Sequence, residues 1–430
     1  MIWLNALAAL AYLASAVYIL RRYTKYAVLF GSLTSMQVWA LISCFYNDLG
    51  VYNFELFRLT ETTLATTRLA SFYLLFNVGF ILAALVLERT VLMRREYGLK
   101  EFNLRLGNFK FVLYAAIAGI ALVLGFNLYT EGIPILTGLD RLAFYQQTGL
   151  LDRLLLAYGA LIAFLLGLFR VKTGRISWNG IILLIMLVYA VLVGHKFSFQ
   201  LGVVTAYYVP IFVHYLAGRS RFKLFRWKYA VICLIAIVVF TGFAYTTYFR
   251  LLGTTEGAGT LLTDRVLAGQ GEMWWAYDKQ LSEQGDFDRS QWQTELDFIV
   301  SPETGSPDAV GMRYLMVEIL GPSRAFALFD RGYLFTMAYP AILIAIMPYG
   351  IALLLQLLAG GLFLVLLYYL HFCIVYEHRF RALVVMTMIL PFITLLYTGN
   401  LFVFLTFGMI VKGLVILALE TGPFVNAGKT

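Results

Sequence analysis

The feature that most constrains this chain is a long polar stretch, Tyr248 to Gly332, in a sequence that is otherwise almost continuously apolar. The 430 residues are 61% hydrophobic and only 13% charged, and most of the chain divides into long apolar runs separated by short charged clusters. A run of about 20 apolar residues crosses a bilayer as a helix, because a helix satisfies its own backbone hydrogen bonds. The polar stretch therefore has to lie outside the bilayer.

These runs predict an all-α polytopic integral membrane protein with about 11 transmembrane helices. We expect a single polytopic membrane domain over residues 1–430, in which residues 249–332 form one large periplasmic loop. The expected spans are residues 2–20, 26–46, 69–91, 110–129, 152–170, 178–195, 199–217, 229–248, 350–373, 382–398 and 400–418. No basic residue precedes the first run, so we predict a retained helix and not a cleaved signal peptide.

The apolar residues 333–376 are long enough for two spans. Two spans would place the basic residues that follow them on the outer face. Pro340 and Pro348 also interrupt the apolar run, and proline breaks a helix interior. We therefore predict one span here, preceded by a short apolar segment that lies along the bilayer surface or dips into the bilayer and returns.

The basic residues occupy alternate connections between the expected spans, and this sets the predicted orientation. The clusters are Arg21 to Lys25, Arg89 to Lys110, Arg170 to Arg175, Arg219 to Lys228 and Arg379 to Arg381. Because Lys and Arg are enriched in cytoplasmic connections, we place the N-terminus and the polar stretch outside and the C-terminus inside. The net charge is +9, but most of the basic residues lie in these short clusters and not on one long face. We therefore expect no nucleic acid partner.

No sequence motif indicates a cofactor. Cys44, Cys233 and Cys373 lie in or at the ends of apolar runs, which argues against a disulfide framework or a thiolate metal site. Phosphate-binding, dinucleotide-binding and nucleophile-elbow motifs are absent. The polar stretch contains no histidine, which argues against a histidine triad or a zinc site there. Lys412, inside the last span, is either an intramembrane functional charge or a side chain that reaches back to the cytoplasmic surface.

Two acidic pairs in the polar stretch, Asp286 with Asp288 and Glu295 with Asp297, have a spacing that could hold a divalent cation. Short acidic pairs also arise by chance in an acidic segment, and a hard cation needs several oxygen ligands. We predict no metal site. The polar stretch carries more carboxylates than basic residues, so an anionic ligand has to be held by particular arginines.

Basic residues on the predicted outer face are candidates for holding such an anion. They are Arg58, Arg68, Arg141, Lys196, Arg250, Arg265, Lys279, Arg289, Arg313, Arg324 and Arg331. The planar fork of arginine donates two parallel hydrogen bonds to phosphate oxygens. Each of these residues could instead pair with a neighbouring carboxylate or a lipid headgroup. Arg141 and Lys196 lie in short Gly- or Pro-punctuated outer connections, which hold their charges close to the bilayer surface.

Glu272 and the tryptophans after it are the other candidates in the polar stretch. Glu272 follows Arg265 by two helical turns, so a helix over both would place them on one face. A carboxylate beside a substrate hydroxyl can act as general base, and the alternative is a structural ion pair. Trp274 and Trp275 offer flat surfaces that could stack on sugar rings, although interfacial tryptophans are common in membrane proteins.

The layout resembles the bacterial O-antigen polymerases of the Wzy type. The segments that carry the resemblance are Gly132-Ile-Pro134 with Asp140-Arg141, Gly194-His195-Lys196-Phe-Ser198, and Arg265 through Trp275. The resemblance covers the whole chain as a pattern of spans, with one mid-chain outer loop and one much larger outer loop that both contain arginine.

This resemblance implies a membrane-embedded glycosyltransferase of the C type in the bacterial inner membrane, active in lipopolysaccharide and polysaccharide biosynthesis. It would transfer a growing glycan from undecaprenyl diphosphate onto a new undecaprenyl-diphosphate-linked oligosaccharide at the periplasmic face. It leaves open whether a chain-length regulator protein is a partner. The expected catalytic residues are Arg141, Arg265 and Glu272, with Glu318 second to Glu272 as base; the expected substrate-binding residues are Lys196, Arg250, Trp274, Trp275, Arg313 and Arg324.

Three other functions fit a basic polytopic protein. The O-antigen ligases have a similar layout but carry a histidine in the large loop, which this chain lacks. Another polyprenyl-dependent glycosyltransferase would share the chemistry. A lipid-linked oligosaccharide flippase should show repeated halves and charges along the middle of the bundle, and it has no need of a long polar outer loop.

Overall fold

Nearly all of the chain that the computed structural model describes is helical. The described residues are 1–53, 56, 58–89, 106–137, 144, 150–170, 178–195, 197–218, 263–264, 266–284, 289–303, 305–330, 334–335 and 339–421. They fall into two compact units: unit 1 contains residues 1–100, 263–370 and 384–430, and unit 2 contains residues 101–262 and 371–383.

Unit 1 combines long apolar helices with a group of short ones. Its helices are α1 (Ile2–Arg22), α2 (Ala27–Asn47), α3 (Ala65–Arg89), α12 (Glu272–Gln284), α13 (Arg289–Val300), α14 (Gly311–Leu320), α15 (Pro322–Asp330), α16 (Ala341–Ile346), α17 (Tyr349–Val375), α18 (Arg379–Thr398), α19 (Leu401–Phe404) and α20 (Phe407–Thr421), of which α17 ends and α18 begins in unit 2. Two 3-10 turns, Thr24–Tyr26 and Pro307–Ala309, and an antiparallel pair of short strands, β1 (Tyr52–Asn53) and β2 (Arg58–Leu59), complete it.

The long helices expose apolar side chains where a water-soluble protein would be polar. Trp3 on α1 is 83% exposed and Phe407 on α20 is 80% exposed, and both helices carry further exposed leucines. Helices of this kind are stable only where lipid covers them, because water would leave a large apolar surface uncovered. The chain is therefore an all-α membrane protein.

Ten of the predicted spans can be compared with described helices. Seven helices are long and apolar enough to cross a membrane: Ile2–Arg22, Thr24–Asn47, Ala65–Arg89, Phe199–Leu216, Tyr349–Val375, Arg379–Thr398 and Leu401–Ala418. Three shorter apolar helices, Ile117–Thr130, Ala157–Phe169 and Trp178–Leu192, fall on three other predicted spans. The predicted span 229–248 lies outside the described residues.

The prediction of one span after Pro348 is confirmed. A single helix, α17, runs from Tyr349 to Val375, and the short apolar helix α16 precedes it between the two prolines. The residues of α16 are all buried, and the helix packs against α12, α13 and α14. Whether this segment lies along the bilayer surface or dips into the bilayer stays a prediction.

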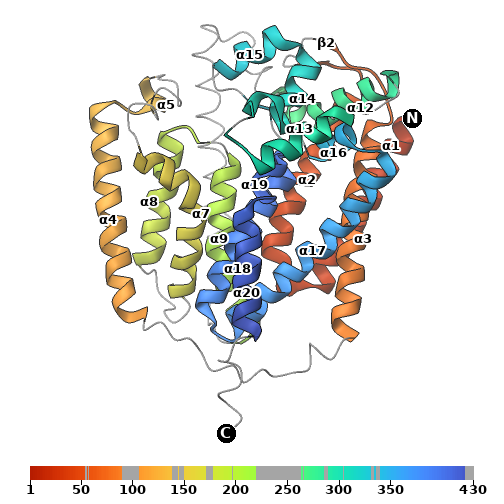
Figure 1. Ribbon diagram of the computed structural model, residues 1–430. Helices are drawn as coiled ribbons and strands as arrows, with labels where there is room; N and C mark the ends of the chain where they lie inside the picture. Colours follow the sequence, from red (N-terminus) through yellow and green to blue (C-terminus); the bar gives the residue numbers. More distant parts are fainter. Residues whose placement is uncertain are drawn as a thin grey trace. The chain divides into compact units, whose positions relative to one another are not determined.

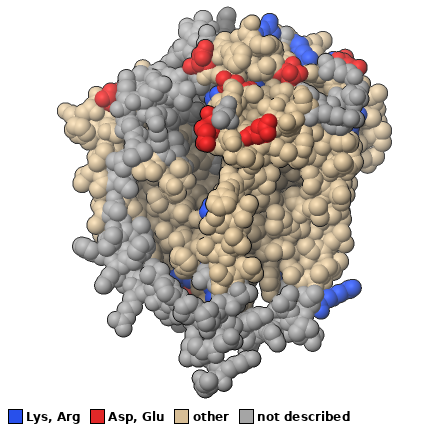
Figure 2. Space-filling view, in the orientation of Figure 1, with Lys and Arg blue, Asp and Glu red and all other residues tan. Residues whose placement is uncertain are grey.

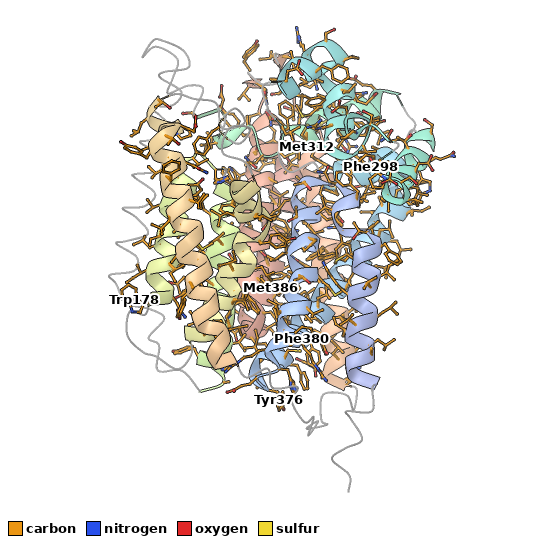
Figure 3. The ribbon with its side chains drawn as sticks, turned by 60° about the vertical axis from the view of Figure 1, so that its left-hand side comes forward. Trp178, Phe298, Met312, Tyr376, Phe380 and Met386 are labelled. Atoms are coloured by element: carbon orange, nitrogen blue, oxygen red, sulfur yellow. The ribbon has the colours of Figure 1, made fainter. Side chains whose placement is uncertain are left out.

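The helices α12 to α15 form a cap, defined here as residues 263–330, on one end of unit 1. Figure 1 shows these helices beyond the ends of α2 and α19. In Figure 2 acidic and basic side chains gather over the cap, whereas the flanks formed by the long helices are almost uniformly tan. Phe298 of α13 and Met312 of α14 lie at this end in Figure 3, whereas Met386, in the first half of α18, lies well away from it. The Phe298 ring packs 4.9 Å from that of Phe402 in α19.

Glycines bring α3 and α17 into backbone contact below the cap. A Cβ atom added at Gly79 of α3 would lie 1.9 Å from the carbonyl oxygen of Leu357 in α17. A Cβ atom added at Gly360 would lie 1.9 Å from the carbonyl oxygen of Phe76 in α3. Small residues allow transmembrane helices to approach this closely, so the crossing fixes the two helices whose first residues border the cap.

Unit 2 is a smaller helical group. Its helices are α4 (Leu106–Thr130), α5 (Pro134–Thr137), α7 (Leu150–Arg170), α8 (Trp178–Leu192) and α9 (Phe197–Leu216). The helices α7 and α9 pack closely at Gly167, where an added Cβ atom would lie 2.3 Å from the carbonyl oxygen of Tyr207. The side chain of Asn179 in α8 accepts a hydrogen bond from Tyr114 of α4 and donates one to Leu166 of α7.

Candidate active site

One attachment of the cap to the long helices is made by a buried carboxylate, Asp48, directly after α2. Its Oδ1 accepts hydrogen bonds from the N–H and O–H of Thr63, at 3.0 and 2.6 Å, and from the indole Nε1 of Trp275, at 3.1 Å. Its Oδ2 accepts from Asn5 at 2.8 Å and from the N–H and O–H of Thr66 at 3.2 and 2.7 Å. Asp48 therefore joins α1, α2, α3 and α12 without a cationic partner.

Trp274 and Trp275 are buried between α12 and the long helices. They are 1% and 0% exposed, and the indole Nε1 of Trp274 donates to the backbone carbonyl of Ala65 at 2.8 Å. Buried tryptophans usually find a partner for this donor, and both do here. Their burial leaves no ring face for a sugar, so the structure contradicts the predicted sugar-stacking role and assigns both residues to the attachment of the cap.

A turn over residues 268–271 docks directly on α2. The hydroxyl of Ser43 donates to the carbonyl of Ala268 and accepts from the N–H of Gly271, the second bond at 2.7 Å. A Cβ atom at Gly271 would lie 2.3 Å from the backbone nitrogen of Cys44 and 2.6 Å from the carbonyl oxygen of Ala40. Only glycine fits at this contact, so the sequence Ala-Gly-Gln-Gly serves to bring the cap backbone onto the helix.

The same turn changes the interpretation of Glu272. The helix α12 begins at Glu272 after a turn over residues 268–271, so the helix that would have placed Arg265 and Glu272 on one face is interrupted there. The Glu272 side chain is 0% exposed and faces Asn53, whose Nδ2 lies 3.4 Å from its Oε2. A carboxylate enclosed in this way cannot reach a substrate hydroxyl in this structure, which argues against Glu272 as the general base.

A second acidic residue of α12 lies at the edge of the cap. The carboxylate of Asp278 accepts a hydrogen bond from Arg68 Nη2 of α3 at 2.6 Å. The Asp278 side chain is 4% exposed, whereas that of Arg68 is 34% exposed. Burial raises the pKa of Asp278 to about 6, and the hydrogen bond and charge of Arg68 oppose that rise.

Aromatic rings surround this ion pair. The ring of Phe72 in α3 lies 5.3 Å from that of Trp274 in α12 and 5.3 Å from that of Tyr349, the first residue of α17. Tyr349 is 36% exposed, so α3, α12 and α17 meet at an edge with one accessible phenol and one accessible guanidinium. The Nε–H of Arg68 is buried and makes no hydrogen bond within the described ranges, and the exposed third of the side chain is the part that a ligand can reach.

Two further cations flank the cap tryptophan. The Arg58 guanidinium lies 5.3 Å and the Lys279 ammonium 5.8 Å from the Trp275 ring. Lys279 also pairs with Glu61 at 2.8 Å and with Glu283 at 3.7 Å. Partial burial lowers the pKa of Arg58, against the raising effect of the nearby glutamates. Positive and negative groups alternate here, so this surface presents no broad positive field.

Another buried carboxylate, Glu295 of α13, organises the far side of the cap. Its Oε1 accepts from the backbone N–H of Gly311 at 2.5 Å and from Gln291 at 3.2 Å. Burial raises the pKa of Glu295, whereas these two hydrogen bonds lower it. The Oδ1 of Asn400 accepts from the N–H of Met312 at 3.1 Å, so the turn before α19 caps α14. Glu295 thus has a positioning role for α14.

Of the remaining basic residues predicted for the site, two are described by the structure and four are not. Arg313 forms an ion pair with Asp308 and lies 5.1 Å from the Phe329 ring, so it ties α14 to its neighbours. Arg324 is exposed on α15. Arg141, Lys196, Arg250 and Arg265 lie outside the described residues, and so do Asp286 and Asp288.

The other acidic pair does not converge. Glu295 is buried and Asp297 is exposed, because residues two positions apart on a helix point to nearly opposite sides. The structure shows no group of three or more His, Cys, Asp or Glu side chains with metal-ligand geometry among the residues it describes. The Lys412 ammonium in α20 donates to the carbonyl of Thr387 in α18 at 3.3 Å, which ties these two helices together.

The fold and the buried polar contacts define a polytopic helical membrane protein with a helical cap held by carboxylates. Residues 306–412, which run from just before α14 into α20, match the model of a family of unknown function (DUF6418). A comparison with curated proteins gives no match. A comparison with solved structures gives none either.

Proposed function

We propose that the protein is a polymerase of lipid-linked oligosaccharides, a membrane glycosyltransferase of the O-antigen polymerase type. It transfers a growing glycan from undecaprenyl diphosphate to the terminal sugar of a new undecaprenyl-diphosphate-linked repeat unit. The reaction takes place at the periplasmic face of the bacterial inner membrane. The observation that carries this proposal is the polar cap on the apolar spans, with the accessible Arg68 guanidinium beside Asp278 at the junction.

The junction suits the two parts of such a substrate. A polyprenyl chain remains in the bilayer, while its diphosphate and first sugars lie at the bilayer surface. Arg68 extends from the first turn of a long apolar helix with its side chain one third exposed, and guanidinium groups hold phosphate oxygens through charge-assisted hydrogen bonds. Arg141, Arg265, Lys196 and Arg250 remain candidates for further contacts to the two diphosphates.

The chemistry requires few groups. Diphosphate is a good leaving group whose negative charge grows in the transition state, so fixed guanidinium groups aimed at it lower the barrier. The acceptor hydroxyl needs one base. Neither ATP nor a nucleotide sugar is required, because the donor is already activated by its diphosphate.

The distribution of buried charge favours this proposal over a flippase. In the described part of the chain, the buried carboxylates are Asp48, Glu272, Asp278 and Glu295, and all lie in the cap or at its docking surface. A flippase moves a polar headgroup through the bundle and needs polar groups along the middle of the helices. The buried polar side chains along the long helices, such as Gln37 and Asn77, are neutral and bonded to neighbouring helices, so the buried carboxylates of the described residues are concentrated at one end.

The test is incubation of purified protein in detergent with a lipid-diphosphate-linked oligosaccharide, with and without EDTA, followed by gel analysis of the glycan. We expect a ladder of polymer lengths that survives chelation. Arg68→Ala, Arg141→Ala and Arg265→Ala should each abolish the ladder without preventing membrane insertion. Arg22→Ala, which removes an exposed arginine from the last turn of α1, is the matched control and should keep it.

Other results of this experiment would support a metal-dependent reaction, a ligase or a flippase. A ladder that is lost with EDTA would contradict metal independence and return attention to the acidic pairs of the cap. No ladder from the cognate substrate would contradict the polymerase. Transfer to a lipid A acceptor would then favour a ligase, and movement of the substrate between leaflets of a vesicle would favour a flippase.

A further inference from the structure

We propose that Asp278 is the general base of the glycan transfer and that Arg68 positions its carboxyl group, an inference that rests on the proposed polymerase function. The two side chains come from helices that are far apart in the sequence and meet at the cap edge, with Arg68 Nη2 2.6 Å from Asp278 Oδ2.

The comparison among the buried carboxylates selects Asp278. Asp48 is saturated by hydrogen-bond donors from three other elements. Glu295 is fixed by Gly311 and Gln291, and Glu272 is fully enclosed. Asp278 has one oxygen bonded to Arg68, and its Oδ1 makes no hydrogen bond within the described residues. Glu295 Oε2 also makes no hydrogen bond within the described residues, but that atom is buried, whereas Asp278 lies beside the part-exposed Arg68.

The surroundings of Asp278 suit a substrate approaching from the bilayer surface. Its partner Arg68 is a third exposed, and the phenol of Tyr349 lies close enough to interact electrostatically with both. Tyr349 is itself 36% exposed at the start of α17. A sugar hydroxyl bound at this edge would meet Oδ1 of Asp278, and the exposed part of the Arg68 side chain would face the diphosphate of the donor.

The step balances with these groups alone. The acceptor hydroxyl oxygen attacks the anomeric carbon of the donor glycan, and the new glycosidic C–O bond forms. The bond from that carbon to the diphosphate oxygen breaks, and its electron pair leaves with undecaprenyl diphosphate. The hydroxyl proton moves to Oδ1 of Asp278 and is later released to water.

The electrostatic setting gives this carboxyl group suitable basicity. Burial and, to a smaller extent, the Asp48 charge raise the pKa of Asp278 and Arg68 lowers it, so that the net pKa is about 6. The thiol of Cys44 in α2 and the phenol of Tyr349 in α17 are the other titratable groups that face it. A general base works best when its pKa lies near the working pH. Without Arg68, the carboxyl group would stay protonated to higher pH and lose its fixed orientation.

The experiment measures initial rates of polymer formation across pH 5 to 8 with a lipid-diphosphate-linked oligosaccharide as donor and acceptor. Wild type is compared with Asp278→Asn, Asp278→Glu and Arg68→Lys. The matched control is Glu283→Gln, which replaces an exposed carboxylate of the same helix. Size-exclusion profiles and melting temperatures in detergent report whether each variant is folded.

We expect Asp278→Asn to lose about 100-fold or more in kcat, the usual contribution of a general base, with KM little changed. Asp278→Glu should recover part of the rate. Arg68→Lys should shift the acidic limb of the pH profile upward, because a lysine cannot hold the carboxyl group with the same geometry. Glu283→Gln should retain the wild-type profile.

The outcomes separate the inference from the function on which it rests. If wild type forms polymer and folded Asp278→Asn forms it at a rate within tenfold of wild type, the assignment of the base is wrong. If Asp278→Asn does not fold, the profiles of wild type and Arg68→Lys decide: an acidic limb near pH 6 that moves in the variant supports the assignment, and identical profiles contradict it. If wild type forms no polymer, the proposed function fails and the inference fails with it.

Discussion

Asp48 and Asp278 are two buried carboxylates at the same end of unit 1, and their surroundings differ. Among the described residues Asp48 has no cationic partner, and it accepts hydrogen bonds from Asn5, Thr63, Thr66 and Trp275. Asp278 has one partner, Arg68, and a pKa raised to about 6. Several neutral donors of fixed geometry hold the Asp48 side chain in a structural role. Asp278 keeps an oxygen that makes no hydrogen bond within the described residues, and its raised pKa allows it to accept a proton near neutral pH.

The largest effect that can test this comparison is expected from Asp48→Asn. In this variant an NH2 group replaces one of the two accepting oxygens. That group cannot accept a hydrogen bond, so the buried donors that bond the replaced oxygen would lose their partner. We expect a loss of about 3 kcal/mol or more in stability. Yield and melting temperature in detergent measure it. Asp297→Asn, an exposed aspartate in α13, should leave both unchanged, and an equal loss in the two variants would contradict the role of Asp48.

A smaller loss is expected from Gly271→Ala. The new methyl group would lie 2.3 Å from the backbone nitrogen of Cys44, and neither backbone can yield without lifting the turn from α2. We expect about 2 kcal/mol of destabilisation and faster proteolysis within the cap. Gly413→Ala in α20 is the control because its added methyl group meets nothing within 4 Å. Equal proteolysis rates in the two variants would show that the close contact is not needed.

Trp275→Phe sharpens the account of Asp48 by removing one donor and keeping an aromatic ring. The indole Nε1 bond to Asp48 Oδ1 is lost while Thr63 continues to donate to the same oxygen. We expect a loss of about 1–2 kcal/mol, seen as a melting temperature lower by a few degrees. A variant with an unchanged melting temperature would mean that the hydrogen bond contributes little.

The spans could be predicted from the sequence because bilayer thickness fixes the length of an apolar run. Proline positions likewise predicted the break before α17. The pairing of Arg68 with Asp278 could not be predicted, because the two residues are separated by 210 positions and nothing local links them. Arg68 was present among the outer-face basic residues, but a single sequence does not rank such residues.

Local patterns also gave wrong predictions in the cap. Trp274 and Trp275 resemble interfacial tryptophans, whereas packing against α3 buries both. The spacing of Glu272 and Arg265 would give a shared face only on one continuous helix, whereas the turn that ends at Gly271 begins a new helix. In each case a tertiary contact with α2 or α3 overrides the local pattern, and the sequence around residue 272 contains no signal of that contact.

The smallest expected effect is the pH dependence of stability that arises from Asp278. Its pKa in the folded protein is raised from 3.8 to about 6, so the folded state binds this proton more tightly than the unfolded state does. This contribution to stability is complete below pH 3.8 and is lost as the pH rises to 6. Melting temperatures measured between pH 4 and 7 should show a decline in wild type that is weaker in Asp278→Asn. Parallel curves would contradict the raised pKa.

The most direct test of the contrast between the two carboxylates is an infrared titration of the protein in detergent. Protonated carboxyl groups are followed from pH 3 to 8, and the bands are assigned with Asp278→Asn and with Asp297→Asn as the control. The account predicts that Asn at position 278 removes a protonated band with a midpoint near pH 6. A midpoint near pH 4 for that band would contradict it, because Asp278 would then be an ordinary ion-paired carboxylate and not a group poised to accept a proton.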